Sequence, residues 1–205
     1  MKAYFEGDKD VLVFKPIPIS KRGRKKNSNE VGAKKVLDAC CGSRMFWFDK
    51  KNPIVMFCDK RQEKVTLCDG RTFEVTPDII ADFQHLPFQD ETFYLVVFDP
   101  PHLIHAGAKS WLAQKYGVLP DNWKDVLSRG FQECMRVLKN NGTLIFKWSE
   151  TDIPVSTIIS VIGKQPLFGH KSGKLNKTHW LCFFKEVNDE KSRETKGAES
   201  ADTKL

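Results

Sequence analysis

The stretch 92–102 joins an apolar run to an abrupt polar ending. Residues 93–98 are β-branched and aromatic without polar alternation, which is typical of a central parallel strand covered on both faces. Asp99-Pro100-Pro101 then ends the strand, because two prolines remove two backbone donors and fix two φ angles. We therefore predict that Asp99 lies at the carboxyl end of this strand, at the edge where open α/β sheets bind ligands.

Two shorter apolar runs predict strands that lead into a ligand site. Val36-Leu37 is followed by a turn with one glycine, 38–43, after which we expect a short helix over 44–49. Residues 54–58 are followed by Asp59, about 20 positions beyond the turn, where a carboxylate can accept hydrogen bonds from ribose hydroxyls. A strand, a tight turn and a helix N-terminus form the opening of nucleoside and dinucleotide sites.

The chain between Asp59 and the central run predicts a hairpin where doubly wound folds usually have a crossover helix. Residues 64–68 and 71–75 flank Asp69-Gly70, a turn signal because type I′ turns need positive φ at both central positions. Residues 79–81 form a short strand that ends in Asp82. Three predicted strands thus end in an acid.

The C-terminal half alternates helical and extended patterns, which implies a mostly parallel sheet with right-handed crossovers. Asp121 is the expected N-cap of a helix that runs to about residue 138, and the long connection 101–120 before it predicts a lid. The remaining expected elements are a strand at 11–14, a turn at 140–142, a strand at 143–148, a helix at 154–162, and strands at 165–168 and 179–185 joined by a basic loop.

Length and composition predict one globular domain with loose ends. A chain of 205 residues with 40% hydrophobic content can bury one sizeable core. We expect a basic N-terminal extension with a mobile loop at 1–32, the main domain at 33–185 and a disordered tail at 186–205. The chain shows neither an apolar run of membrane-spanning length nor the apolar core of a signal peptide, so we expect a cytoplasmic protein without a membrane partner.

The six cysteines indicate neither a metal site nor a disulfide framework. They show no C-x-x-C spacing, and Cys40 and Cys41 are adjacent. We expect reduced, mostly buried thiols and no metal.

The net charge of +7 is concentrated near the N-terminus. Residues 1–35 contain ten Lys and Arg against four Asp and Glu, whereas residues 186–205 contain four against six. The segment from Lys21 to Lys26 and the segment from Lys171 to Lys177 are the basic clusters that could contact the phosphates of a nucleic acid. A solvated loop is the alternative interpretation of each.

Five features, taken together with their order and spacing along the chain, resemble the class I S-adenosylmethionine-dependent methyltransferases over residues 33–185. The Asp99-Pro-Pro-His102 stretch is similar to the Asp/Asn-Pro-Pro-aromatic motif of the enzymes that methylate amino groups. The other four are the first motif at 36–43 (VLDACCGS), the ribose-binding acid at Asp59, the adenine stretch at Asp82 and 86–88, and the turn at 136–142 (RVLKNNG).

This resemblance implies an α/β fold with a Rossmann-like, seven-stranded, mostly parallel sheet, helices on both faces and a C-terminal antiparallel hairpin. It implies S-adenosylmethionine as cofactor and places Lys147, at the end of the fifth strand, near the acceptor. Asp99 and the Pro100 carbonyl would hold the target nitrogen. The implied cofactor-binding residues are Asp38, Ala39, Cys40, Cys41, Gly42 and Ser43 for the methionine part, Asp59 for the ribose, and Asp82 and Phe83 for the adenine; the implied catalytic residues are Asp99, Pro100, Pro101 and His102.

Two residues depart from the family pattern. Arg44 replaces a glycine of the first motif, where it either restricts the approach to the cofactor or places a positive charge near its carboxylate. His102 replaces the aromatic residue that stacks on a flipped base. An imidazole can stack, act as a general base or have a structural role.

The Asp-Pro-Pro motif and the two basic segments lead us to expect methylation of a nitrogen of a nucleic-acid base. Because the compact chain shows no target-recognition domain, we expect the acceptor to be RNA or poorly discriminated DNA. The first alternative is a methyltransferase that acts on a small molecule or a protein side chain. The second is a non-catalytic nucleic-acid-binding module on a methyltransferase scaffold. The presence of all four acids, Asp38, Asp59, Asp82 and Asp99, argues against the second alternative.

Overall fold

The computed structural model describes residues 2–5, 12–15, 34–66, 70–107 and 110–187, and the chain divides into two units, 1–31 and 32–205. In the first unit, β1 (Lys2–Phe5) and β2 (Leu12–Lys15) pair as an antiparallel hairpin. The sequence predicted a strand at β2 and missed β1. The predicted loop at 20–29, with its basic cluster, and the tail from residue 188 onward lie outside the described residues.

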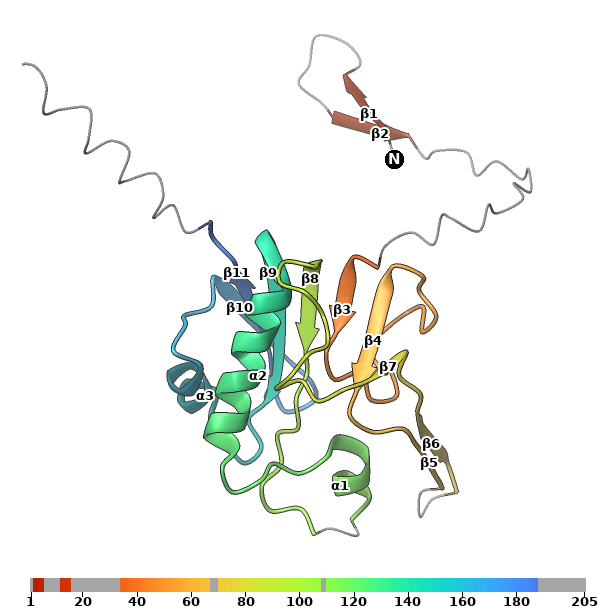
Figure 1. The fold of residues 1–205 in the computed structure, drawn as a ribbon, viewed down its shortest axis with the longest axis vertical. Helices are drawn as coiled ribbons and strands as arrows, with labels where there is room; N and C mark the ends of the chain where they lie inside the picture. Colours follow the sequence, from red (N-terminus) through yellow and green to blue (C-terminus); the bar gives the residue numbers. More distant parts are fainter. Residues whose placement is uncertain (1, 6–11, 16–33, 67–69, 108–109, 188–205) are drawn as a thin grey trace, which may run out of the picture. The chain divides into compact units, whose positions relative to one another are not determined.

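The second unit is built on a seven-stranded sheet with the order β10-β11-β9-β8-β3-β4-β7 (Figure 1). The strands from β7 to β9 in this order run parallel, and β11 runs antiparallel to both β9 and β10. This sheet confirms the predicted Rossmann-like, seven-stranded, mostly parallel arrangement with a C-terminal antiparallel hairpin. The strands are β3 (Val36–Asp38), β4 (Val55–Asp59), β7 (Ile79–Ile80), β8 (Phe93–Phe98), β9 (Leu138–Ser149), β10 (Phe168–Ser172) and β11 (Thr178–Phe184).

The apolar run at 93–98 is the central strand that its composition predicts. β8 lies between β3 and β9, and Val96 and Phe98 are completely buried. Because β3, β4 and β8 are parallel, Asp38, Asp59 and Asp99 all come to the same edge of the sheet. The fold therefore brings together acids that are far apart in the sequence.

The helices cover the sheet unevenly. The three described helices are α1 (Trp111–Tyr116), α2 (Trp123–Val137) and α3 (Val155–Ile162). α2 and α3 pack together over β8 and β9, and their buried residues belong to the same core as Leu37, Phe98 and Phe146. Among the described residues no helix packs on the opposite face, so the expectation of helices on both faces is corrected.

Turns and a hairpin replace the helices of that second face. Residues 44–49 form turns instead of the predicted helix, because Arg44 has the left-handed φ of 56° and Trp47 is held by the ring of Phe57, 5.4 Å away. Between β4 and β7 the chain forms the predicted hairpin of β5 (Glu63–Thr66) and β6 (Thr72–Val75). The predicted turn residue Asp69 lies outside the described residues.

Element ends in the C-terminal half differ from the predictions. α2 has Asn122 as its N-cap, without a side-chain cap bond, instead of Asp121. β9 begins at Leu138 and runs through 140–142, where a separate turn was predicted, with Asn141 at a φ of 61°. β10 is displaced by three residues from the predicted 165–168, and α1 was missed within the long connection. Boundaries depend on pairing and are weakly encoded in local pattern.

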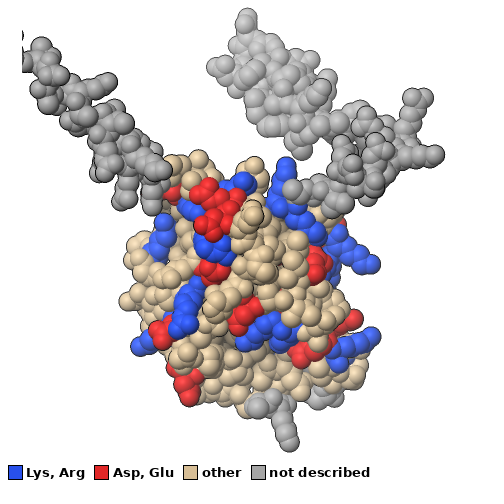
Figure 2. Space-filling model, in the orientation of Figure 1, with Lys and Arg blue, Asp and Glu red and all other residues tan. Residues whose placement is uncertain are grey.

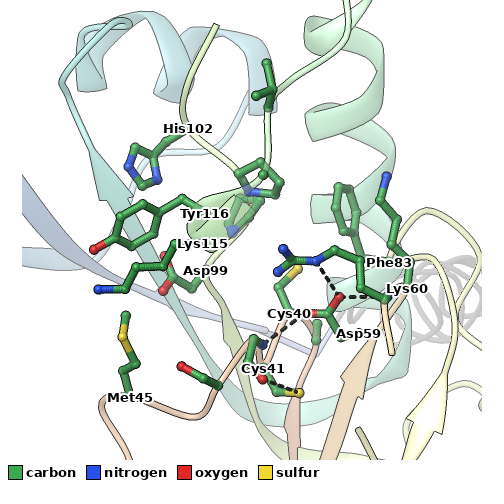
Figure 3. A pocket seen from close by; sticks show the side chains of 18 of the residues that line it. Cys40, Cys41, Met45, Asp59, Lys60, Phe83, Asp99, His102, Lys115 and Tyr116 are labelled. Atoms are coloured by element: carbon green, nitrogen blue, oxygen red, sulfur yellow. Dashed lines mark hydrogen bonds and ion pairs between the residues drawn. The ribbon is translucent and has the colours of Figure 1, made fainter. Parts of the chain in front are cut away.

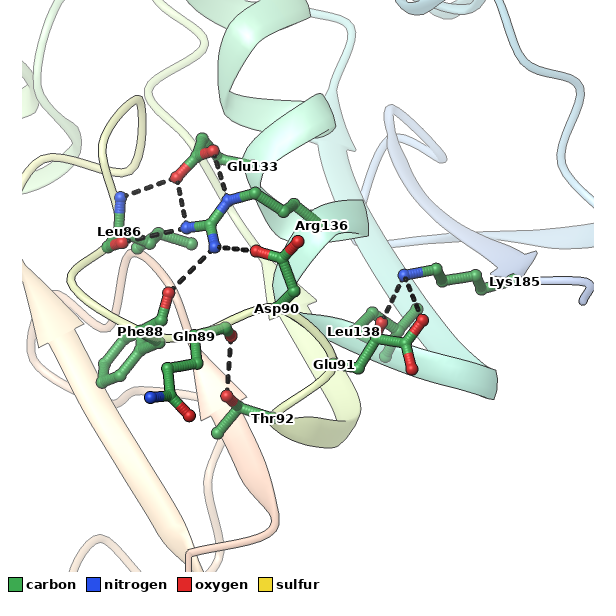
Figure 4. Close-up of polar contacts among 10 residues, drawn as sticks. All are labelled: Leu86, Phe88, Gln89, Asp90, Glu91, Thr92, Glu133, Arg136, Leu138 and Lys185. Atoms are coloured by element: carbon green, nitrogen blue, oxygen red, sulfur yellow. Dashed lines mark hydrogen bonds and ion pairs between the residues drawn. The ribbon is translucent and has the colours of Figure 1, made fainter. Parts of the chain in front are cut away.

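Arg136 joins α2 to the loop that leads into β8 (Figure 4). Its guanidinium donates to Glu133 at 2.7 and 2.8 Å, to Asp90 at 2.7 Å, and to the carbonyls of Leu86 and Phe88. The Glu133 carboxylate also accepts from the backbone of Leu86 at 2.9 Å. Arg136 therefore has a structural role: it anchors α2 to the loop before β8, at the edge of the sheet opposite Asp38, Asp59 and Asp99.

No helix in the described part of the chain is long and apolar enough to cross a membrane. The five cysteines in this part are free thiols: Cys40, Cys41, Cys58, Cys134 and Cys182.

Candidate functional site

A pocket opens at the carboxyl edge of the sheet, where β3, β4 and β8 end (Figure 3). Lys115 and Tyr116 of α1, the helix that Figure 1 shows beyond these strand ends, also line it. It contains most of the predicted site residues. Those that line it are Ala39, Cys40, Cys41, Gly42, Ser43, Asp59, Phe83, Asp99, Pro100, Pro101 and His102. Asp38 and Asp82 are outside its wall.

The turn after β3 is tied directly to the end of β4. The backbone N–H of Gly42 donates to Oδ2 of Asp59 at 2.9 Å, and Gly42 has a positive φ of 47°, a backbone conformation that glycine adopts without strain. The turn and the predicted ribose acid therefore form one unit. Burial raises the pKa of the Cys40 and Cys41 thiols, so neither is a ready nucleophile.

Asp59 is further held by Arg61, which sequence reasoning did not single out. Oδ1 of Asp59 accepts from the Arg61 backbone at 2.9 Å and from its Nε at 3.3 Å. The same guanidinium donates to the Gln114 carbonyl of α1 at 3.0 Å. Arg61 therefore links the cofactor side of the pocket to the helix above it, and Oδ2 of Asp59 retains capacity for one more donor.

Asp38 lies completely buried behind the turn. Its carboxylate accepts from Trp47 Nε1 at 2.7 Å and from the Cys40 backbone at 3.3 Å. Burial, opposed by the Trp47 bond, raises the pKa of Asp38 to about 7. Asp38 shapes the turn from behind, and a direct part in cofactor binding stays a prediction.

Phe83 and Asp82 point to different environments. The Phe83 ring lines the pocket and contacts Phe98 edge to face at 5.2 Å. The Asp82 carboxylate accepts from the Gln84 backbone at 2.9 Å. Phe83 therefore lines the pocket and Asp82 does not, and the adenine contact expected of each stays a prediction.

Asp99 forms an ion pair with Lys147 of β9. Lys147 Nζ lies 2.5 Å from Asp99 Oδ2, and each side chain is one-fifth exposed. Burial raises the pKa of Asp99, and the Lys147 charge opposes that rise. The acceptor side thus contains a carboxylate together with its own cation.

His102 lies across the pocket from the turn, as Figure 3 shows. Its ring is 5.4 Å from Tyr116 and 6.2 Å from the buried Trp148. Burial lowers the pKa of His102 below its ordinary value, so the imidazole is neutral at pH 7 and keeps a lone pair. A neutral ring in this position can both contact a planar ligand and accept a proton.

Arg44 does not face the pocket. Its guanidinium donates to the carbonyls of Lys50 and Thr76, pairs with Asp78 at 3.2 Å and stacks 3.8 Å above the Phe57 ring. These bonds hold the positive charge under the second face of the sheet. Arg44 therefore has a structural role in this chain. The contacts of its guanidinium support neither a restricted approach to the cofactor nor a positive charge near the cofactor's carboxylate.

The structure adds pocket residues that the sequence did not indicate, among them Met45, Phe46, Lys115 and Tyr116. α1 is placed over the pocket by Gly117, whose φ of 74° and close approach to Pro101 leave little room for a side chain. The one sequence signal was the unusual length of the connection after Pro101.

The comparisons with known proteins give likenesses among solved structures. No family model and no curated protein matches this sequence. The PH0226 protein of Pyrococcus horikoshii OT3 is similar over 75% of this chain and 82% of its own, with 17% identity and a TM-score of 0.46.

Two further likenesses are to methyltransferases. A SAM-dependent methyltransferase of Leishmania major is similar over 75% of this chain and 65% of its own, with 13% identity and a TM-score of 0.43. The 1,6-didemethyltoxoflavin-N1-methyltransferase of Burkholderia thailandensis, solved with 1,6-didemethyltoxoflavin and S-adenosylhomocysteine, is similar over 74% of this chain and 71% of its own, with 12% identity and a TM-score of 0.43. The fold described above rests on the sheet order and strand directions of this chain itself.

Proposed function

We propose that this chain is an S-adenosylmethionine-dependent methyltransferase that methylates a nitrogen of a nucleic-acid base. One observation carries the proposal: the glycine turn, Asp59 and the Asp99-Pro-Pro-His102 motif come from three strands and line a single pocket. The cofactor and acceptor residues implied by the resemblance are thus within reach of one another.

The residues of the pocket fit the cofactor. Asp59 can accept a ribose hydroxyl on Oδ2, and the Phe83 ring offers an apolar surface for adenine. Asp59 and Asp99 line the pocket with carboxyl groups, which complement a cationic sulfonium. When bound, the cofactor supplies a methyl group that is already activated for transfer.

The chain's own residues then have to position the acceptor. Asp99 and the Pro100 carbonyl can accept hydrogen bonds from a nitrogen and direct its lone pair toward the methyl carbon. Neutral His102 can accept the proton that the nitrogen loses. Proximity and alignment supply most of the rate, because no further activation of the methyl group is needed.

Aromatic rings favour a planar acceptor. His102 and Tyr116 line the acceptor side of the pocket (Figure 3), and Phe46, which also lines the pocket, lies beside the ammonium that pairs with Asp99. Flat surfaces of this kind contact a heterocycle well. A small planar molecule would satisfy the same rings, so it is the second candidate.

Exposed lysines support the nucleic-acid acceptor over the small molecule. Lys171, Lys174 and Lys177 are exposed, and Thr178 beside them pairs with Ser149 at the carboxyl end of β9. Their charges thus flank the edge that holds the pocket, where phosphates could be bound. On the face in Figure 2, by contrast, basic and acidic side chains are interspersed.

Calorimetric titration tests the cofactor half of the proposal. We expect Asp59→Ala to weaken S-adenosylmethionine binding, and Asp99→Ala to leave it nearly unchanged while lowering turnover by about 100-fold or more. Asp121→Ala, an exposed position outside the pocket, is the matched control. Well-folded protein without detectable binding would contradict the proposal.

A tritiated-methyl assay tests the acceptor. Total RNA, genomic DNA, protein extract and a metabolite fraction are each incubated with the protein and labelled S-adenosylmethionine. We expect label in nucleic acid, released on digestion as a methylated base. Label confined to metabolites or protein would replace the nucleic-acid proposal with the alternative.

A further inference from the structure

Lys147 lies in an unusual environment for a lysine on a sheet. Its ammonium is 2.5 Å from Asp99 Oδ2, 5.6 Å from the Phe46 ring centre and 5.7 Å from the Trp180 ring centre. Trp180 is the direct pairing partner of Lys147 on β11, and Phe46 meets Trp180 edge to face at 5.6 Å. Asp99 and Phe46 both line the pocket, and Lys147 lies directly behind them with one-fifth of its side chain exposed.

The environment of Asp99 shows what this ammonium does. The charged or titratable groups coupled to Asp99 are Lys147 from β9, Asp38 from β3, Cys40 from the turn after β3 and His102 from its own loop. Burial favours a protonated Asp99, whereas the charge and the hydrogen bond of Lys147 favour the carboxylate. Lys147 therefore maintains the acceptor character on which the proposed role of Asp99 depends.

The ammonium also retains hydrogen-bonding capacity. It has three N–H donors, and in the described part of the chain Asp99 is its one hydrogen-bond partner, while the two rings offer cation–π contacts. The ion pair therefore presents a free carboxylate oxygen next to a free donor. A ligand edge complementary to it has an N–H beside an atom with a lone pair.

We propose that Lys147 is a positioning and specificity residue of the acceptor site, which orients Asp99 and donates a hydrogen bond to a lone-pair atom beside the target nitrogen. The inference rests on the proposed function and narrows its substrate class. The favoured acceptors are planar bases with a donor–acceptor edge, such as the amino group and ring nitrogen of adenine or cytosine.

The first experiment needs no acceptor. The protein is labelled with [4-¹³C]aspartate, and the Asp99 carboxyl signal, assigned by its loss in Asp99→Asn, is titrated by NMR in wild type, Lys147→Met and Lys147→Arg. We expect Lys147→Met to raise the pKa of Asp99 by about one unit or more, and Lys147→Arg to keep it close to wild type. An unchanged Asp99 titration in folded Lys147→Met would overturn the inference, even if the protein proved to be an active methyltransferase.

The second experiment measures specificity. Turnover is compared on oligoadenylate and on the same oligomer with 1-deazaadenine, and on oligocytidylate and its 3-deazacytosine analogue, in which a C–H replaces the lone-pair nitrogen. We expect wild type to prefer the natural base by about tenfold or more, Lys147→Met to lose the preference, and Lys147→Arg to restore part of it. Equal discrimination by wild type and folded Lys147→Met would overturn the inference.

S-adenosylmethionine affinity separates this inference from the proposed function. Lys147→Met should bind the cofactor as wild type does and lose kcat/KM at pH 7, with its acidic limb moved to higher pH. Loss of cofactor binding in wild type would contradict the proposed function and leave the NMR titration to decide the inference on its own.

Discussion

The two faces of the sheet are built from alternate residues of the same strands, yet they differ in covering and in charge. On the face under α2 and α3, Leu37, Phe98 and Phe146 are completely buried in one apolar core. The residues that follow them, Asp38, Asp99 and Lys147, belong to the other face. Turns, without a described helix, cover that face.

The two faces therefore have different roles: one stabilises the fold and the other holds the groups that can take part in chemistry. A helix-covered face buries large side chains and favours apolar residues at every inward position. The face under the turns holds an acid or a lysine at the end of each central strand, where polar neighbours and the pocket can satisfy them. We expect substitutions on the first face to act mainly on folding and those on the second to act through hydrogen bonds and protonation.

The largest effect should come from the helix-covered face. Phe131 of α2 is buried between the rings of Phe183, 5.0 Å away, and Phe146, 6.5 Å away. Phe131→Ala should lower the free energy of unfolding by about 3–5 kcal/mol, because it leaves a cavity in a packed core. Urea denaturation measures this, with the fully exposed Phe48→Ala as the control. Equal free energies of unfolding for the two variants would contradict the large contribution to stability that we assign to the helix-covered face.

The next effect is a pH dependence on the turn-covered face. The pKa of Asp38 is raised to about 7 in the folded protein, so the native state binds this proton more tightly than the unfolded chain. The resulting stability is fully present below about pH 4 and is lost as the pH rises through about 7.

Asp38→Asn removes this titration. Between pH 5 and pH 8, the cofactor-free wild type should lose about 2–3 kcal/mol of unfolding free energy relative to Asp38→Asn. Exposed Asp49→Asn is the control and should track wild type at both pH values. Parallel pH profiles for wild type and Asp38→Asn would show that the buried carboxyl does not titrate in this range.

The smallest effect concerns the hydrogen bond that holds Asp38. Trp47→Phe keeps an aromatic ring beside Phe57 and removes the 2.7 Å bond from Nε1. We expect a loss of about 1–2 kcal/mol and a further rise of the Asp38 pKa, because this bond stabilises the carboxylate. The half-exposed Trp111→Phe is the matched control. A loss of unfolding free energy as large as that of Phe131→Ala would mean that the turns contribute as much to stability as the helices do.

Local pattern was sufficient for several elements. The prolines after Asp99, the acid after β4, the hairpin in place of a helix and the apolar periodicity of α2 each follow from neighbouring residues. Such signals act within a few positions, through φ restriction, turn chemistry and side-chain period. The helix expected over 44–49 was wrong because Trp47 and Arg44 are held by residues elsewhere in the chain, which override local helix propensity.

Local pattern alone was therefore enough to place the central strands and their acidic ends, and it carried the resemblance that implies a seven-stranded sheet. Only the tertiary structure decided which face lacks a helix and how Asp99 is paired. The physical reason is separation along the chain: Lys147 follows Asp99 by 48 residues, and Gln114 follows Arg61 by 53. No local pattern encodes such pairs, because they form when parallel strands bring their carboxyl ends to one edge.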